Sequence, residues 1–495
     1  MMRVLLPLPF AVPIVGMALS LAAVRHRRIQ RAISAVALAI TLGASVAILL
    51  HVTRDGTSVT SFGGWPADIS IMLVADRLAS LMLVLGMGMT ALVLVFAFGQ
   101  GGTDESSPFY HPAYLALAAG IALAFLSGDL FNLFVAFELL LMASYVLVTL
   151  EGNDSQIRSG TTYVVLNVIE SALLISAVGL VFAATGTVSM AELATRVAEL
   201  PSGLQVGLNL LLLVAFGMKA AVFPLFFWLP DSYPTAPSPV AAIFAGLLTK
   251  IGVYAMFRTE TLLFPGGQRQ LLLVVAGFTM IVGVLGAIAQ ADMKRIISFH
   301  IISQIGYMVM GLGIGTSAAL AATVFYMLHH IPTKTSLFLI EGIIERRTGT
   351  SNLDRIGGLL HRSGPFAILF LMPALSLAGI PPFSGFVGKF ALLAAGFDAK
   401  QWAIVAVSLV ASLLTLVSMT KIWVGAFWGK IEPTIPSGEP AGILRSTRIM
   451  SAATMVAVGS SVCIAIFAGP LFGFCEAAAR EISDPSNYIK AVFGR

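Results

Sequence analysis

Charged residues are scarce in this sequence. Only 11% of its 495 residues are Asp, Glu, Lys or Arg, and 58% are hydrophobic, whereas about a quarter of the residues in ordinary globular domains are charged. Apolar runs of about 20 residues, the length that spans a hydrocarbon core of ~30 Å, recur along the whole chain. This composition argues against a water-soluble protein and indicates a polytopic membrane protein.

Cysteine and long polar segments are scarce as well. The two cysteines, Cys463 and Cys475, fall in one apolar segment, where helical geometry separates them by about 18 Å, too far for a disulfide. This excludes a disulfide framework and a Cys-rich metal or iron–sulfur site. The loops are too short for a catalytic domain, and GGWP and GFVG lack the strand that a phosphate loop needs. We therefore expect no enzymatic activity, cofactor or metal in this chain.

Basic residues outnumber acidic ones by 29 to 24, which gives a net charge of +5. They are scattered over short loops, which argues against nucleic acid binding. If the loop with Arg25, Arg27, Arg28 and Arg31 faces the cytoplasm, alternate later loops are also the more basic ones, as the positive-inside rule requires. The run at 4–24 reads as a retained first helix, because a basic loop and another span follow it. An even number of spans then places both termini outside.

Apolar runs between polar or Pro/Gly-rich breaks predict about fourteen membrane-spanning helices and an all-α fold. Their predicted limits are 4–24, 32–52, 71–99, 110–127, 129–150, 161–185, 206–228, 239–259, 269–290, 296–315, 318–344, 364–397, 402–427 and 449–474. The seventh span contains Pro224, and the twelfth contains AGIPPFSG at 378–385. Proline breaks a helix, and interrupted spans in two halves of a chain are typical of transporters built from repeats.

Ionisable side chains lie near the middle of four spans. They are Glu138, Glu170, Lys219 and Lys250. Each costs about 2.5–3.5 kcal/mol at the centre of a membrane, so the four must contact one another or water. Desolvation disfavours their charged forms, and a Glu/Lys pair restores them. A lysine whose charge depends on a neighbouring carboxylate is a proton-relay element.

Later spans add more such groups. In LHHIPTKTSLF, His330 and Lys334 lie one turn apart on one helix face, with His329 beside them, and Lys389 follows the proline break. Lys421 and Glu170 are further candidates for the relay. For Lys421, near a span end, snorkelling to the interface is the alternative; a purely structural ion pair is the alternative for Glu170, and a local hydrogen bond for the histidines.

Four motifs resemble the antiporter-like subunits shared by Mrp-type multisubunit Na⁺/H⁺ antiporters and respiratory complex I. They are DLFNLFVAFELLLMASYVLV, FGMKAAVFPLFFWLPDSYPTAPSPVAAIFAGLLTKIGVYAMFR, DMKRIISFHIISQIGYM and LSLAGIPPFSGFVGKF. Within this superfamily the chain most resembles the D-type family of Mrp subunits, on the basis of GGWPADISIMLVADRLASLM at 63–82, the Glu138 helix and its length. Lys389 also differs from the complex I subunit that has a glutamate there.

The resemblance implies two inverted five-helix repeats, spans 4–8 and 9–13, in which spans 7 and 12 are broken. The corresponding divisions are 1–109, 110–260, 261–430 and 431–495. It further implies that Glu138 and Lys219 form a coupling pair, that Lys250 is the central relay, that His330 is a bridge and that Lys389 is the terminal lysine. Lys334 matches a lysine of some family members, and which of His329 and His330 relays stays open.

The function implied is proton translocation in a Na⁺/H⁺ antiporter of a bacterial plasma membrane, with the A, B, C, E, F and G subunits of such an antiporter as partners. The competing class is a proton-pumping subunit of complex I or a membrane-bound hydrogenase, and a third is a purely structural membrane subunit. Because the chain has no cluster of carboxylates and carbonyls suited to dehydrate Na⁺, we expect the cation path in partner subunits or at their interfaces.

Overall fold

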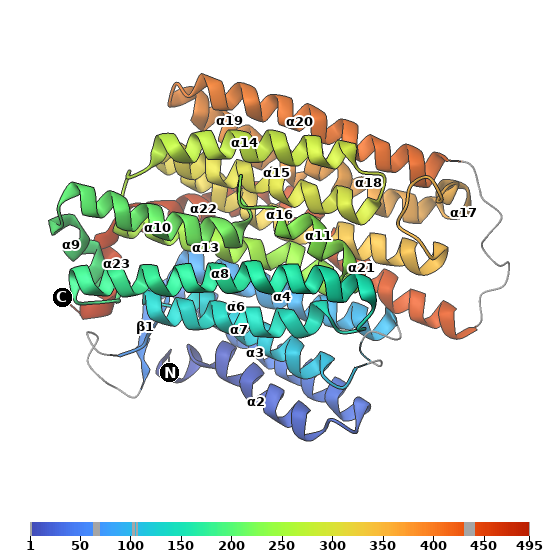
Figure 1. Cartoon of the computed structure of the whole chain (residues 1–495), viewed down its shortest axis with the longest axis horizontal. Helices are drawn as coiled ribbons and strands as arrows, with labels where there is room; N and C mark the ends of the chain where they lie inside the picture. The colour runs from blue at the N-terminus through green and yellow to red at the C-terminus, as the bar shows by residue number, and fades with distance from the viewer. Residues whose placement is uncertain (1, 63–69, 101–103, 105–106, 430–440, 495) are drawn as a thin grey trace.

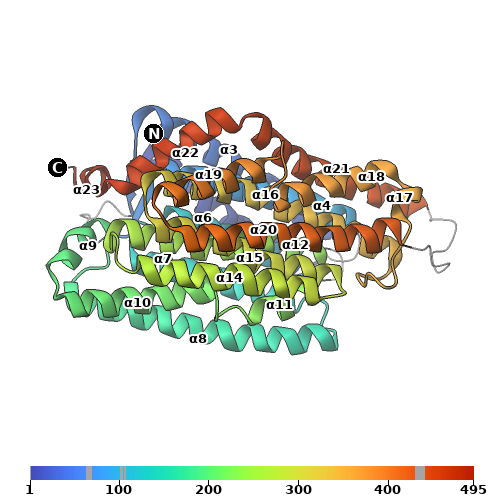
Figure 2. The ribbon, with the colours of Figure 1, turned by 90° about the horizontal axis from the view of Figure 1, so that it is seen from above.

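The structure is a computed structural model that describes residues 2–494 except 63–69, 101–103, 105–106 and 430–440. Long helices run side by side along one direction and form a single bundle (Figure 1). Viewed from above, α8 lies at one edge of the bundle and α22 at the opposite edge (Figure 2). The first part of the sequence motif at 63–82 falls outside the described residues.

The N-terminal segment contributes three long helices and the one two-stranded sheet in the described part of the chain. Its elements are α1 (Met2–Leu5), α2 (Leu8–Ala22), α3 (Arg27–Asp55), β1 (Ser58–Ser61), β2 (Met72–Ala75) and α4 (Arg77–Gln100). The strands are antiparallel, with Ser58 opposite Ala75. The predicted span 71–99 therefore begins as a strand and becomes helical only at Arg77.

The next segment ends in a long interrupted helix. Its elements are α6 (Tyr110–Leu126), α7 (Leu130–Val148), α8 (Asp154–Thr185), α9 (Met190–Arg196), η2 (Val197–Glu199), α10 (Ser202–Ala220), α11 (Trp228–Ser232), η3 (Tyr233–Thr235), α12 (Ser238–Ile243), η4 (Phe244–Leu248), α13 (Thr249–Arg258) and η5 (Thr259–Leu263). Segments η4 and η5 are π-helical, so α12 to η5 continue as one helix.

The remaining helices complete the bundle. They are α14 (Arg269–Ala289), α15 (Met293–Ile314), α16 (Ser317–Thr348), α17 (Leu359–Arg362), α18 (Gly364–Ala378), α19 (Ser384–Asp398), α20 (Trp402–Ile422), η6 (Trp423–Trp428), α21 (Ala441–Ile466), α22 (Ala468–Ser483) and α23 (Pro485–Phe493). The predicted span 449–474 is present, but its end is wrong: the apolar helix runs over Thr447–Ile466, and α22 starts anew at Ala468. Pro470 lies in the first turn of α22, where helical N–H groups have no intrahelical partner.

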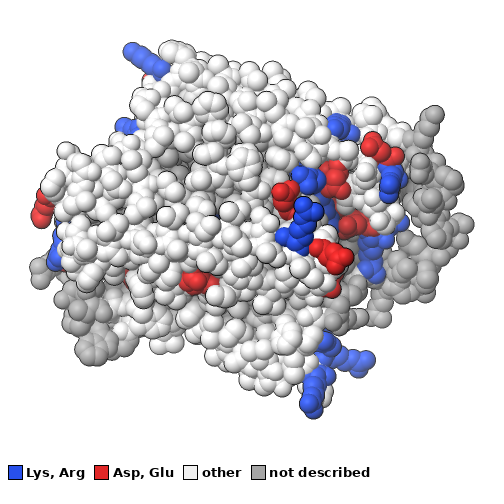
Figure 3. Space-filling model, viewed as in Figure 1, with Lys and Arg blue, Asp and Glu red and all other residues white. Residues whose placement is uncertain are grey.

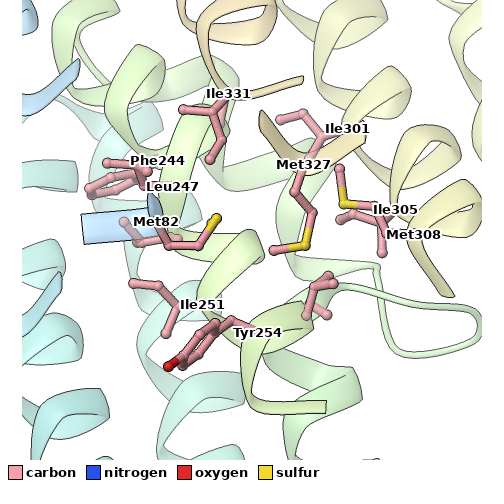
Figure 4. Packing of buried hydrophobic residues seen from close by; sticks show 14 of the residues in the cluster. Met82, Phe244, Leu247, Ile251, Tyr254, Ile301, Ile305, Met308, Met327 and Ile331 are labelled. Carbon is pink, nitrogen blue, oxygen red and sulfur yellow. The ribbon is translucent and has the colours of Figure 1, made fainter. Parts of the chain in front are cut away.

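Burial divides the helices into an inner and an outer set. The apolar window of Ser238–Leu263 is 100% buried and that of Met293–Ile314 is 94% buried, whereas that of Asp154–Thr185 is only 33% buried. Figure 4 shows the inner packing, in which Phe244 and Ile251 lie on one side of the core and Met308 and Met327 on the other. The inner helices therefore face other helices, and the outer ones present apolar side chains outward.

The outer surface has the charge distribution of a membrane protein. Lys, Arg, Asp and Glu gather mainly at one end of the bundle, while most of the face in Figure 3 is uncharged. Ten helices in the described residues are long and apolar enough to cross a membrane, and three more are shorter. The all-α multi-pass fold is confirmed; the count of fourteen spans stays a prediction.

Helices α14 and α15 pack with almost no space between their backbones. A Cβ atom on Gly283 would clash with the backbone nitrogen of Ser303, whereas one on Gly207 would meet nothing within 4 Å. We expect Gly283→Val to destabilise the protein by about 1–3 kcal/mol, the typical effect of overpacking, and Gly207→Val to act as a neutral control. The thermal unfolding midpoint of the purified protein measures both, and equal midpoints would contradict the packing argument.

Candidate functional site

The predicted break in the seventh span is present. Helix α10 ends at Ala220, Ala221 adopts a left-handed φ of 60°, and the Phe223–Pro224 bond is cis. The exposed end of α10 is partly satisfied by a side chain, because Trp228 Nε1 donates a hydrogen bond to the Met218 carbonyl at 3.0 Å. The Phe223 amide also donates to Thr279 Oγ1 at 3.0 Å, so protein side chains bond backbone groups at this break, as is required at membrane depth.

Lys219 lies in the last turn of α10, immediately before this break. Its side chain is 2% exposed, and its Nζ is 3.5 Å from Glu170 Oε2, whose side chain is also 2% exposed. The ammonium also stands 5.5 Å from the centre of the Phe137 ring. Lys219 and Glu170 therefore form a buried ion pair between α10 and α8.

Glu138 makes its hydrogen bond to α8. It is half-buried on α7 and accepts a hydrogen bond from Ser171, the residue after Glu170 on α8. Its charge acts on Lys219 electrostatically, but the ion pair of Lys219 is with Glu170. The ion-pair partner of Lys219 is therefore Glu170, because α8 presents Glu170 inward and Ser171 toward Glu138. The coupling of Glu138 to Lys219 that the resemblance implies stays a prediction.

Lys250 follows the π-helical segment η4 and is completely buried. Its Nζ donates to the Ala245 carbonyl at 2.5 Å and to Thr249 Oγ1 at 3.3 Å. Two residues further on, a Cβ atom on Gly252 would lie 2.6 Å from the backbone nitrogen of Ala220. The helix of Lys250 thus touches the end of α10 that carries Lys219, and π-helical turns of this kind frequently occur at functional sites.

Helix α16 brings three of the predicted residues to the centre of the bundle, all with no exposed surface. His329 Nδ1 is 2.8 Å from Ser384 Oγ on α19, and Lys334 Nζ donates to the Ile297 carbonyl on α15 at 3.1 Å. His330 has no hydrogen-bond partner among the described residues, but it interacts electrostatically with Lys250, Lys334, His329 and Lys389, as a central link would.

The second predicted break separates α18 from α19. Gly379 ends α18 with a φ of 88°, and the Pro381–Pro382 bond is cis. Lys389 reaches back across the break: its Nζ donates to the carbonyls of Leu377 at 2.9 Å and Ala378 at 3.3 Å. A cation at a helix C-terminus is favoured by the helix dipole, so this lysine binds the end of the broken helix.

Further contacts of the terminal lysine come from two other helices. Lys389 Nζ donates to Ser412 Oγ on α20 at 2.9 Å and lies 4.7 Å from the centre of the Tyr307 ring on α15. A Cβ atom on Gly379 would be 2.8 Å from Lys389 Cδ. Glycine at 379 therefore allows the left-handed backbone conformation and leaves room for the Lys389 side chain, which a Cβ atom would obstruct.

Lys421 is partly buried in the last turn of α20. Its Nζ donates to the carbonyls of Ile288 at 2.9 Å and Gln290 at 2.6 Å, at the C-terminal end of α14. It thus binds a helix end, in the same way as Lys389, and lies apart from the groups that interact with His330. The structure gives Lys421 a local partner and no contact with the other candidate residues.

Sequence reasoning missed His300, which lies on α15 inside the quoted motif 292–308. The residue is fully buried, and its Nε2 is 2.8 Å from Ser418 Oγ on α20. It interacts electrostatically with Lys334 and Lys389. The signal was available, since His300 is an ionisable residue within a predicted span, the criterion that identified the other candidates.

Buried lysines, carboxylates and histidines between two broken helices are the features expected of a membrane transporter. The family model described as NADH:quinone oxidoreductase/Mrp antiporter, transmembrane, matches residues 127–415, more than half of the chain. The D subunit of the Na⁺/H⁺ antiporter of Alkalihalophilus pseudofirmus is 44% identical over 99% of both chains. The chain therefore belongs to this antiporter family, and within it to the D-type subunits.

Solved structures agree with this assignment. A chain of the Mrp complex from a Dietzia species is 34% identical, with a TM-score of 0.93 and 99% of each chain covered. A chain of the membrane-bound sulfane sulfur reductase, an archaeal respiratory membrane complex, is 24% identical with a TM-score of 0.90, covering 99% of this chain and 100% of that one, and shares the fold. The predicted resemblance to antiporter-like subunits is thus confirmed.

The two carboxylates near Lys219 are expected to differ in their effect on stability. Glu170→Gln removes the partner of a buried ammonium, a change that costs about 3–5 kcal/mol when a buried pair is broken. Glu138→Gln is the matched control, because the carboxylate is half-buried and the amide oxygen can still accept from Ser171. Thermal unfolding of the purified protein should show the larger loss for Glu170→Gln, and the reverse order would contradict the pairing.

Proposed function

We propose that this chain is the proton-translocating subunit of a multisubunit Na⁺/H⁺ antiporter. The observation that carries the proposal is the buried Glu170–Lys219 ion pair at one broken helix, together with buried ionisable groups that extend from it to Lys389 at the other. The 44% and 36% identical relatives are both named as D subunits of Na⁺/H⁺ antiporters, which supports the same activity. Secondary transport, rather than enzymatic catalysis, is the role proposed for this chain.

The proposed proton route follows the electrostatic contacts given above, except between Lys219 and Lys250, where the close packing of Gly252 on Ala220 connects the two helices. It begins at Glu138 and the Glu170–Lys219 pair, continues through Lys250 and then the α16 groups, and reaches Lys389. A proton that arrives at Glu170 weakens its attraction for the Lys219 ammonium and allows that lysine to release a proton toward Lys250. The α16 groups that continue the route are His330, Lys334 and His329. Lys421 is assigned a structural role.

The two broken helices support the proposed division into repeats. The segment 110–260 contains the break after Lys219, and the segment 261–430 contains the break before Lys389. The flanking parts are 1–109 and 431–495. Equivalent breaks in two halves are expected when the halves are inverted copies that meet at a site near the membrane centre.

The proposed location is a bacterial plasma membrane with both termini outside. The relatives are bacterial, and the basic loops predict that the bundle end with Lys294, Arg295 and α17 faces the cytoplasm; we call this the inner end. The proposed partners are the A, B, C, E, F and G membrane subunits. Na⁺ is assigned to those partners, since no group of three or more His, Cys, Asp or Glu residues suited to a metal ion gathers among the described residues.

Transport by the assembled complex in everted membrane vesicles tests the proposal. Lys219→Ala and Glu138→Ala should each lower Na⁺-dependent dissipation of a pH gradient, and Lys219→Ala should abolish it, because it removes the cation of the ion pair. Lys250→Ala should also lose transport, whereas a purely structural subunit would transport normally. Immunoblotting verifies that the complex assembles. Unchanged antiport in both Glu138→Ala and Lys219→Ala would refute the proposed function.

A further inference from the structure

A second cluster of ionisable groups lies at the inner end of α16, outside the set predicted from sequence. Glu341 is fully buried, and Lys294 on α15 donates to Glu345 Oε2 at 2.7 Å. The Glu345 side chain is 38% exposed, whereas that of Lys294 is 7% exposed. The cluster therefore extends from the surface of the bundle to a carboxylate in its interior.

The buried carboxylate is only partly satisfied. Glu341 Oε1 accepts a hydrogen bond from Ser351, while Oε2 has no hydrogen-bond partner among the described residues. Lys294, Glu345 and Asp292 are the charged groups that act on it. Burying a carboxylate with an unbonded oxygen costs free energy, and an ionisable residue inside a membrane-spanning helix is a candidate for a functional site.

The cluster is held rigidly at the start of α15. The Met293 amide donates to the Ser351 carbonyl, and the Leu353 amide donates to the Ala291 carbonyl, each at 2.9 Å. On the other side, a Cβ atom on Gly342 would lie 2.5 Å from Ser238 Cβ, so α12 packs directly against this part of α16. These contacts fix the position of Ser351, the hydrogen-bond donor of Glu341, next to the start of α15, which packs against α16. We call this contact between α15 and α16 the seam.

This seam leads to the proposed proton route. Seven residues, or about 10.5 Å of helix rise and close to two full turns, separate Glu341 from Lys334 on one face of α16. On α15, Ile297, whose carbonyl accepts from Lys334, is three residues from Lys294, and Ser298 lies one turn from Lys294 on the same face. Ser298 is fully buried and its Oγ has no partner among the described residues. A hydroxyl can both accept and donate a proton.

We propose that Glu341 is the inner mouth of the proton route: it exchanges protons between Lys334, through Ser298, and the Lys294–Glu345 pair at the surface. The step is a proton transfer in which the Glu341 carboxyl group takes up a proton on one side and releases it on the other, without any change in redox state. This inference rests on the proposed function. It adds a site residue and an inner exchange path to the relay between the two broken helices.

Antiport in everted vesicles, whose bath contacts the inner face, tests the inference on the complete complex. Glu341→Gln should slow antiport by about tenfold, corresponding to about 1.4 kcal/mol of barrier, and remove its dependence on bath pH. Glu341→Asp retains an acid, so it should restore most of the rate with a displaced pH profile. Ser298→Ala should cause a smaller loss. Glu192→Gln, an acid on α9 paired with Arg196, is the control expected to behave as wild type.

The outcomes separate this inference from the proposed function. If Lys219→Ala abolishes antiport but Glu341→Gln transports at the normal rate, the role proposed for Glu341 is refuted, and the proposed proton-translocating function is still supported. A Glu341→Gln variant that is slowed equally at every bath pH identifies a structural role and overturns the inference. Should Glu341→Gln fail to assemble, Glu341→Asp decides, because an unchanged pH profile would then overturn it. A wild-type complex without antiport refutes both proposals.

Discussion

Every charge and every freed backbone group inside this bundle needs a partner within the protein, because the surrounding lipid offers none. Three lysines meet this requirement at the C-terminal ends of helices. Lys389 binds the last carbonyls of α18, Lys421 binds those of α14, and Lys219 occupies the last turn of α10. The helix dipole favours a cation at each of these places. Helix ends therefore stabilise these three lysines, whereas the fully buried Lys250 and Lys334 donate to carbonyls elsewhere in the bundle.

All three lysines lie at a helix C-terminus, but they differ in the groups that bind their ammonium. Lys389 and Lys421 are bound by carbonyls, which do not titrate, whereas Lys219 is bound by Glu170, which does. The charge of Lys219 thus depends on the protonation of another group, while the charge of Lys389 depends mainly on fixed dipoles. A relay requires both kinds of site, one that responds to its neighbour and one that holds a constant affinity.

Sequence alone located the depth of the key residues but not the direction in which they face. The prolines predicted both helix breaks, and apolar run lengths placed Glu138 and Glu170 at similar depths. Which carboxylate reaches Lys219 depends on the rotation of α7 and α8 about their axes, and neither helix has a strong enough amphipathic pattern to fix it. The partners of Lys421 could not be predicted either, because they are the carbonyls of Ile288 and Gln290 at the end of α14. Backbone groups freed at a helix end have no side-chain signature in the sequence.

The two breaks are similar in form but place their lysines on opposite sides. Lys219 precedes its break, where the Trp228 side chain donates to the Met218 carbonyl. The Lys219 ammonium instead pairs with the Glu170 carboxylate on α8. Lys389 follows its break and itself supplies the donors that the end of α18 lacks. One break therefore couples its lysine to a titrating group near the half-exposed Glu138, and the other couples its lysine to the backbone. This difference gives the proposed route one end that responds to a titrating neighbour and one end whose lysine is held by backbone carbonyls.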